Sequence, residues 1–230
     1  MFVTNFTNKF FNTLEAKMFV GERMSHPVIT VAPETPIHDV VVMFKKEHIR
    51  RAPVVSNGKL IGIVTENDLL NASPSPVTSL SVWEMNYLIS KVTVKQVMSK
   101  KVKTIDVGTP IEEAARIMAD LKIGGMPVMR DGKVVGMITE TDLFKIFLEL
   151  MGARTKALRI TAVVDDKPGT LAKVTKAIAD TGGNIISCGQ FAGDDPSTRI
   201  LTFKVVGIKK DEIKKALEKY VKKFWDIRQS

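Results

Sequence analysis

The stretch "GIVTENDL", from Gly62 to Leu69, returns 74 residues later (136 minus 62) as "GMITETDL", from Gly136 to Leu143. In both copies a short apolar run leads into Thr-Glu-x-Asp, the pattern of a strand that ends where a helix begins. One copy would indicate only an ordinary strand-to-helix junction. Two copies indicate an internal repeat, which has to be recognised before any other feature of the fold is interpreted.

The repeat extends without a gap from Met24 and Met98 to Leu69 and Leu143, with about a third of the aligned positions identical. Each copy predicts the order β-α-β-β-α, with a tight hairpin turn between its second and third strands. The predicted β segments are Val28–Val31 and Val102–Val107. The helices that follow have Thr35 and Thr109 as N-caps and Pro36 and Pro110 as first helical residues. The predicted turns are Asn57-Gly58 and Asp131-Gly132.

This order, with the motif Gly, hydrophobic, any, Thr or Ser, any, any, Asp, resembles the cystathionine-β-synthase (CBS) domain, and two in tandem resemble a Bateman module. The resemblance implies a ligand of the adenosine-nucleotide class: AMP, ADP or ATP, with S-adenosylmethionine as a further candidate. It also implies a ligand role for Thr65 and Asp68 in the first copy and for Thr139 and Asp142 in the second.

Thr and Asp three residues apart lie on one turn at the start of a helix. The hydroxyl and the exposed helix N–H groups suit a phosphate, and the carboxylate can accept both hydroxyls of a ribose. The same pair also forms a capping box, in which Thr is the N-cap and Asp the third helical residue. Both interpretations remain open from the sequence.

Basic residues precede the strand with the sequence x-Pro-Val, where members of the CBS family contact ligand phosphates. The first copy is the richer, because arginine can bind a phosphate through two hydrogen bonds, whereas the second copy has glycines at the corresponding positions. Solvated arginines without a ligand are the alternative. The candidate residues are His48, Arg50 and Arg51 before Pro53, and Lys122 before Pro127.

The pattern changes after Gly152. Strands and amphipathic helices are predicted in the order β-α-β-β-α-β, with the second helix over 209–224 and a closing strand over 225–230. This order, with "KPGTL" and "GNI", resembles the ferredoxin-like ACT domain. The resemblance implies a small effector, often an amino acid, at Asp166, Gly169, Asn184 and Ile185, usually at a dimer interface. A domain that only dimerises is the alternative.

Two further segments are predicted to contain helices. Phe2, Phe6, Phe10 and Leu14 recur at every fourth position, which forms one apolar stripe if the segment is helical. A helix capped by Ser81 follows a cluster of Ser and Pro and resembles the connector of the acetoin-utilisation (AcuB) group of CBS proteins.

The expected α+β chain therefore comprises an extension at 1–20, CBS repeats at 21–72 and 95–150, a connector at 73–94 and an ACT domain at 157–230.

Composition narrows the functional class. The single cysteine, Cys188, excludes an internal disulfide framework and suits a reducing cytoplasm, and three scattered histidines argue against a zinc site. No apolar run is long enough to span a bilayer, and no secretory signal is recognised. A formal net charge of +9 leaves a nucleic-acid-binding regulator as an alternative, although neither a stacking platform nor a recognition helix supports it.

These features together predict a regulator and not an enzyme, because the hydroxyl residues lack a nucleophile–base–orienter set. We expect a cytoplasmic homodimer that senses an adenosine nucleotide in the cleft between the CBS repeats and transmits that state to a protein partner. The AcuB resemblance implies acetoin or acetyl-CoA metabolism as the process.

Overall fold

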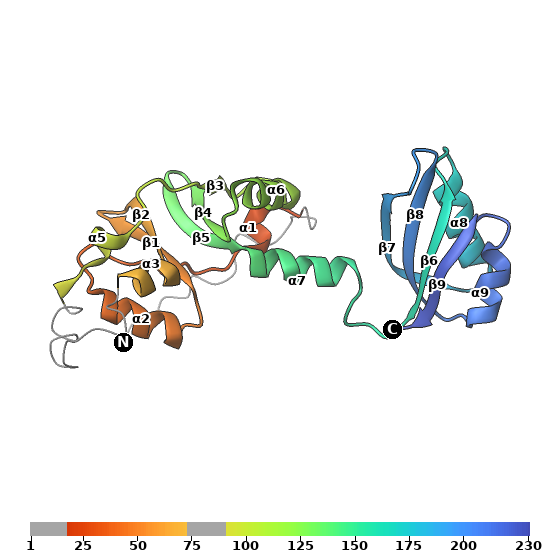
Figure 1. Ribbon diagram of the computed structural model, residues 1–230, viewed down its shortest axis with the longest axis horizontal. Coiled ribbons are helices and arrows are strands. Elements are labelled where there is room, and N and C mark those ends of the chain that lie inside the picture. The colour runs from red at the N-terminus through yellow and green to blue at the C-terminus, as the bar shows by residue number, and fades with distance from the viewer. Residues whose placement is uncertain (1–17, 73–90) are drawn as a thin grey trace, which may run out of the picture. The chain divides into compact units, whose positions relative to one another are not determined.

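The computed structural model describes residues 18–72 and 91–230 (Figure 1). The predicted N-terminal stripe and the connector helix capped by Ser81 lie outside these residues. The chain divides into two compact units, Met1–Leu143 and Phe144–Ser230. In the described ranges, no helix has both the length and the apolar character needed to cross a membrane.

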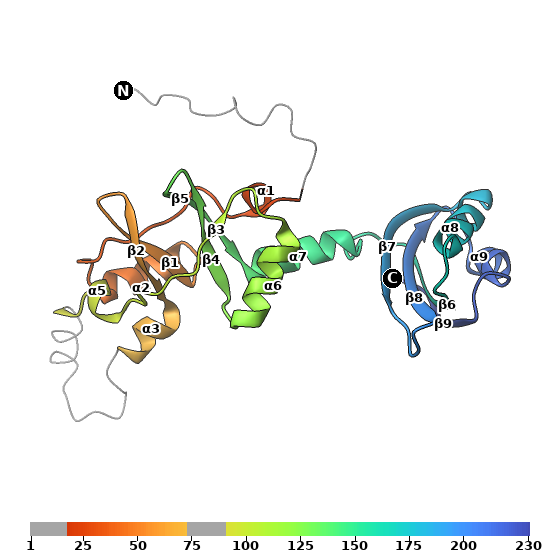
Figure 2. The same ribbon diagram turned by 90° about the horizontal axis from the view of Figure 1, so that it is seen from above.

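The first unit contains the repeats up to the first turn of the last repeat helix, which continues past Leu143. Each repeat is an antiparallel hairpin with a helix before it and a helix starting directly after it (Figures 1 and 2). The predicted strand–turn–strand–helix order is therefore confirmed. The first repeat consists of α2 (Ile37–Lys46), β1 (Arg51–Ser56), β2 (Lys59–Thr65) and α3 (Glu66–Asn71). The second consists of β3 (Ile105–Asp106), α6 (Ile111–Leu121), β4 (Gly125–Arg130), β5 (Lys133–Thr139) and α7 (Glu140–Leu150).

The two hairpin turns have the conformation that their sequences predict. Asn57 and Gly58 have φ angles of 50° and 74°, and Asp131 and Gly132 have the same values. Two consecutive residues with positive φ define the turn that matches the right-handed twist of paired strands, and Asn-Gly and Asp-Gly are the pairs that tolerate it best.

Each repeat has its own core, in which the helix presents apolar residues at helical spacing. In the first repeat Ile37, Val40 and Phe44 are buried against Val54 and Val64 of the hairpin. Ile111, Ala114 and Met118 are the corresponding buried residues of α6. Apolar residues three and four positions apart therefore form the buried face of each helix.

Two local predictions were wrong. The β segments at the start of the repeats are shorter than expected: Val31 forms only an isolated bridge with Val54, and β3 has two residues. Pro36 and Pro110 occupy the N-cap position, so the helices begin one residue later than predicted. Both prolines have extended ψ angles, of 139° and 145°, which exclude them from the first helical turn.

The segment that leads into each repeat packs on the other repeat. The short helix α1 (Val20–Arg23) packs against α6 and β5, and Ser25 pairs with Met137. Conversely, Val94 of α5 (Val94–Val97) is buried in the core of the first repeat, and Ser99 pairs with Ile63. The two repeats thus exchange their leading segments and form one unit.

The second unit is a four-stranded antiparallel sheet in the order β7-β8-β6-β9, with both helices on one face (Figures 1 and 2). This confirms the predicted β-α-β-β-α-β arrangement. Its elements are β6 (Leu158–Asp165), α8 (Thr170–Asp180), β7 (Asn184–Ala192), β8 (Thr198–Val206), α9 (Lys210–Leu217) and β9 (Lys223–Gln229).

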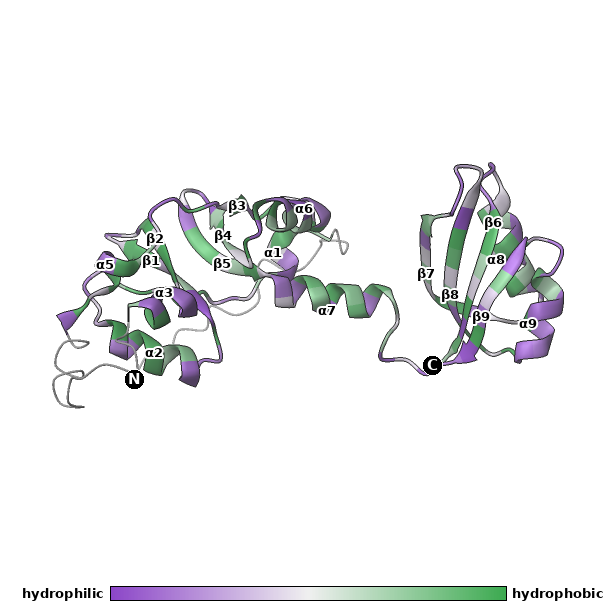
Figure 3. Ribbon diagram, viewed as in Figure 1, coloured by the Kyte–Doolittle hydropathy of each residue, from purple (hydrophilic) through white to green (hydrophobic). Residues whose placement is uncertain are grey.

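Alternation along the central strands buries one face of this sheet beneath the helices. Ile160, Val164, Leu201 and Phe203 pack there with Ile178 of α8. Helix α9 is largely hydrophilic on its outer side, as Figure 3 shows. Its predicted end was wrong: α9 stops at Leu217, and the next residues turn back so that β9 can pair along β6.

Candidate functional site: a basic cleft between the repeats

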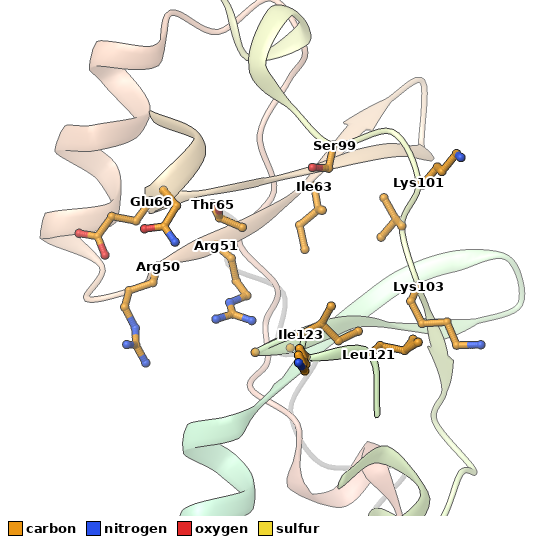
Figure 4. Close-up of a pocket in the computed structure, with 15 residues that line it drawn as sticks. Arg50, Arg51, Ile63, Thr65, Glu66, Ser99, Lys101, Lys103, Leu121 and Ile123 are labelled. Atoms are coloured by element: carbon orange, nitrogen blue, oxygen red, sulfur yellow. The ribbon is translucent and has the colours of Figure 1, made fainter. Parts of the chain in front are cut away.

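A cleft of about 570 Å³ lies between the two repeats (Figure 4). The first repeat contributes residues around the end of β2, including Ile63 and Thr65. The second repeat contributes the stretch that leads from Ser99 toward β3 and the loop between α6 and β4, including Ile123. The volume lies within the range of small-molecule binding sites, which is about 300–1,000 Å³.

Positive charge dominates the lining of the cleft. Figure 4 shows the two arginines on one side and two lysines on the other. Glu66 is the only carboxylate among the described lining residues. Such an excess of cations around a concave surface attracts anionic ligands. The basic lining residues are Arg50, Arg51, Lys101, Lys103 and Lys122.

Arg51 reaches from the first repeat onto the second. A β-carbon placed on Gly124 would collide with the Nη2 atom of Arg51, and one placed on Gly125 would lie 3.0 Å from Nη1. The two glycines therefore leave the space that the guanidinium fills. Burial lowers the pKa of Arg51 below its ordinary value, Glu140 opposes that shift, and Arg50 adds to it. The group keeps its charge at neutral pH.

Thr65 and Asp68 form a complete capping box at the start of α3. The carboxylate oxygen Oδ2 of Asp68 accepts hydrogen bonds from the Thr65 backbone N–H at 2.8 Å and from its hydroxyl at 2.7 Å. The Asp68 N–H in turn donates to Thr65 Oγ1 at 3.3 Å. The Glu66 N–H donates to the carbonyl of Arg50. The hydroxyl and the helix N–H groups that we expected to bind a phosphate therefore already donate hydrogen bonds within the protein.

The second motif forms the same box in a more buried setting. The Thr139 hydroxyl donates to Asp142 Oδ2 at 2.7 Å, and Asp142 is only 6% exposed. Its other oxygen, Oδ1, accepts a hydrogen bond from Ser25 Oγ at 3.4 Å. Arg50 reaches the adjacent Thr141 hydroxyl at 3.5 Å. The second motif is therefore more involved in interactions within the unit than the first.

The predicted site residues divide into two groups. Four of them line the cleft: Arg50, Arg51, Thr65 and Lys122. Histidine 48 is exposed, and its φ angle of 53° places it in the left-handed turn that ends α2. The predicted site residues outside the lining of the cleft are His48, Pro53, Asp68, Pro127, Thr139 and Asp142.

The lining residues that the sequence did not predict include one hydroxyl and two cations, which are Ser99, Lys101 and Lys103. Ser99 belongs to the Met-Ser pair that starts the second repeat, and the two lysines follow it. This segment crosses to the first repeat through the pairing of Ser99 with Ile63. The available signal was the repeated Met-Ser itself. The crossing, however, is a long-range contact that no local pattern encodes.

In the second unit, Asp166 and Gly169 line a small cavity of about 100 Å³. Asp166 accepts a hydrogen bond from Arg199 Nε at 2.9 Å, so its charge is already compensated. Asn184 and Ile185, predicted to join them, begin β7 and are not among the lining residues. Two of the four predicted effector residues therefore line this cavity, and the other two do not.

Comparison with known proteins identifies both units. Residues 20–75 and 94–149 match the CBS domain, and residues 157–228 match the TTHA0829-like ACT domain. A CBS domain-containing protein of Dictyostelium discoideum is 30% identical over 137 residues, which are 59% of this chain and 94% of that protein.

Two solved structures also resemble the chain. One, assigned to an acetoin utilization protein (AcuB) from Vibrio cholerae, is 28% identical and covers 59% of this chain and 94% of its own, with a TM-score of 0.49. The other, the CBS domain pair of protein MJ0100 in complex with 5-methylthioadenosine and S-adenosyl-L-methionine, is 28% identical over 60% of this chain and 98% of its own, with a TM-score of 0.47. The chain belongs to the CBS domain family, with two CBS domains in tandem followed by a TTHA0829-like ACT domain.

Proposed function

We propose that this protein is a regulator that binds an adenosine nucleotide in the cleft between its CBS domains. The observation that carries the proposal is the cleft of about 570 Å³ with five basic side chains and one carboxylate in its described lining. Phosphate groups are the anions that such a set recognises best, because arginine and lysine form charge-assisted hydrogen bonds with them. Ile63, Leu121 and Ile123 offer apolar contacts to a base.

Asp68 is the proposed contact of the ribose. Its Oδ2 atom holds the capping box, and no described residue donates to its Oδ1 atom. A carboxylate oxygen in this state can accept a hydrogen bond from a ribose hydroxyl without breaking the cap. Since Asp68 lies outside the lining of the unliganded cleft, this contact requires the ligand to reach beyond Thr65.

Regulation follows from the position of the cleft. Both repeats line it, so a bound ligand favours one arrangement of the pair over others. In this proposal the ACT domain forms a homodimer and holds a small effector, and a protein partner in acetoin or acetyl-CoA metabolism receives the signal.

A thermal-shift panel tests the proposal with AMP, ADP, ATP and S-adenosylmethionine. A nucleotide present at a hundred times its dissociation constant stabilises the folded protein by about 2.7 kcal/mol, which raises the melting temperature. We expect Lys101→Ala to reduce the shift and Lys100→Ala to leave it unchanged, since Lys100 is an exposed neighbour outside the cleft. No shift with any of the four compounds would reject the proposed ligand class.

A further inference from the structure

The face of the ACT sheet opposite its two helices carries a second cavity, of about 370 Å³. Its residues come from all four strands, and they alternate with the core residues that face α8 and α9. The ACT-like effector positions Asp166 and Gly169 do not contribute to it. This cavity is therefore separate from both sites considered above.

The floor of the cavity is polar although it is buried. Thr161 and Thr202 face each other on β6 and β8, are 7% and 3% exposed, and share one hydrogen bond of 3.2 Å between their hydroxyls. Two hydroxyls carry two protons, and their mutual bond uses one of them. No acceptor for the second proton is found among the described residues. A buried hydroxyl with an unused proton is a recognition element for a ligand oxygen.

Aromatic rings bound the floor at both edges of the sheet. Gly189 lies opposite Thr202, and a β-carbon there would lie 3.3 Å from Cε2 of Phe191, so the Phe191 ring covers the glycine. On the other edge, Trp225 lies at the irregularity where β9 pairs with β6, and bulges of this kind redirect a side chain. Phe191 and Trp225 are 49% and 46% exposed.

A row of cations crosses the sheet beside this floor. Arg159 on β6 lies directly opposite Lys204 on β8 and Arg228 on β9. Like charges in such positions repel each other. Asp226 is the carboxylate that both arginines contact, at 3.4 Å from Arg159 Nη1 and 2.6 Å from Arg228 Nε.

The remaining cation of the row has no carboxylate partner in the described part of the chain. Lys204 is 6% exposed, and its ammonium donates to the carbonyls of Gly152 at 3.0 Å and Thr155 at 2.9 Å. The row therefore carries three positive charges against one negative charge. Each arginine uses one of its five N–H groups in its hydrogen bond to Asp226, and among the described residues no side chain occupies the other four.

We propose that this cavity binds a small aromatic carboxylate, with its ring between Phe191 and Trp225 and its carboxylate toward Arg159 and Arg228. The ring walls favour a planar apolar group, and the cationic row favours an anion in bidentate contact with a guanidinium. The hydroxyl pair adds a donor beneath the ligand. The size fits a one- or two-ring compound, since drug-sized ligands occupy sites of about 300 Å³ and above.

The test uses the full chain with Trp83→Phe, which leaves Trp225 as the only tryptophan of the two in the sequence. The probe is 2-naphthoate, compared with 2-naphthamide, which has a similar shape but no charge. Calorimetry should show at least about tenfold tighter binding of the carboxylate, corresponding to one charge-assisted contact. The indole N–H resonance of Trp225 in the NMR spectrum should move with the same saturation curve.

Substitutions locate the site. Arg228→Gln and Phe191→Ala should each weaken 2-naphthoate binding about tenfold or more, whereas Lys214→Gln on α9, across the sheet, should leave it unchanged. Binding that does not move the Trp225 resonance, equal affinity for the amide, or no binding at millimolar concentration would overturn the proposal. So would a Trp225 resonance that moves with protein concentration alone, because the face would then be an interface between copies.

Discussion

At the scale of single residues, the two Thr–Asp pairs have the same motif but differ in the burial and hydrogen bonding of the carboxylate. Both pairs form capping boxes with nearly identical geometry. Asp142 is buried and accepts a hydrogen bond from Ser25. The Oδ1 atom of Asp68, which is only half-buried, has no donor in the described part of the chain. The first motif is therefore the one that we expect to exchange a solvent contact for a ligand contact.

Replacing Asp68 separates its two roles. Asp68→Ala should lower the free energy of unfolding by about 1 kcal/mol through loss of the cap. It should also weaken AMP binding by about 1.5–3 kcal/mol through loss of a charge-assisted hydrogen bond. Gln96→Ala is the control, because it removes the capping box of α5 at Thr93 without altering the cleft. Urea unfolding and calorimetry measure the two effects. Equal AMP affinity in wild type and Asp68→Ala would reduce Asp68 to a cap.

At the scale of elements, the exchange of leading segments explains the glycine of each repeated octapeptide. A β-carbon on Gly62 would lie 2.5 Å from Sδ of Met98, and one on Gly136 would collide with Sδ of Met24. Each glycine thus accommodates a methionine from the segment that leads into the other repeat. The sequence repeats both residues at the same spacing, but only the fold shows that Met98 contacts the first repeat and Met24 the second.

This contact predicts a specific coupling. Gly62→Ala should destabilise the protein by about 1–3 kcal/mol, because the added methyl group forces Met98 to move. Met98→Ala should also destabilise it by removing a half-buried side chain. The double variant should be less destabilised than the sum of the single variants, since the smaller residue 98 leaves room for the methyl group. Urea unfolding midpoints of the four proteins provide the measurement, and strictly additive effects would show that the pair does not interact.

Most elements could be predicted from the sequence, because their signals are local. Asn57-Gly58 specifies a hairpin turn, and the spacing of Ile37, Val40 and Phe44 specifies a buried helix face. Predictions failed where distant pairing decided the outcome. The chain after Leu217 turns back to pair along β6 despite a helix-like pattern, and the lysine-rich stretch after Ser99 enters the cleft because its segment crosses between repeats.

At the scale of the whole molecule, the two units have separate cores, and their functions should separate as well. Unit one has its core residues in the repeats, whereas unit two has its own cluster around Phe203. The order of the ACT sheet leaves β7 and β9 as edge strands, which are available for pairing with a second copy. We therefore propose that dimer formation belongs to the ACT domain and nucleotide binding to the CBS pair.

Truncation tests this division. A chain that ends at residue 156 should bind AMP with the affinity of the full chain, because it retains every described residue that lines the cleft. Light scattering should give the full chain twice its mass of 25.4 kDa and give the truncated chain the mass of a monomer. A monomeric full chain would contradict the proposed dimer. A truncated chain that is folded but has lost AMP binding would show that the ACT domain contributes to the nucleotide site.

The central claim is that the basic cleft recognises the phosphate of an adenosine nucleotide. The direct measurement is the ratio of AMP to adenosine affinity, by calorimetry at low and moderate salt. The wild-type protein should prefer AMP by at least about tenfold at low salt, and the preference should fall as salt screens the charges.

Two double variants with the same change in charge make this measurement specific. Arg50→Ala/Lys101→Ala removes one cation from each side of the cleft, whereas Lys46→Ala/Lys100→Ala removes two exposed cations outside its lining. We predict that the first variant loses the preference for AMP and that the second retains it. Equal affinity of the wild-type protein for AMP and adenosine, or a preference that survives in Arg50→Ala/Lys101→Ala, would contradict the account.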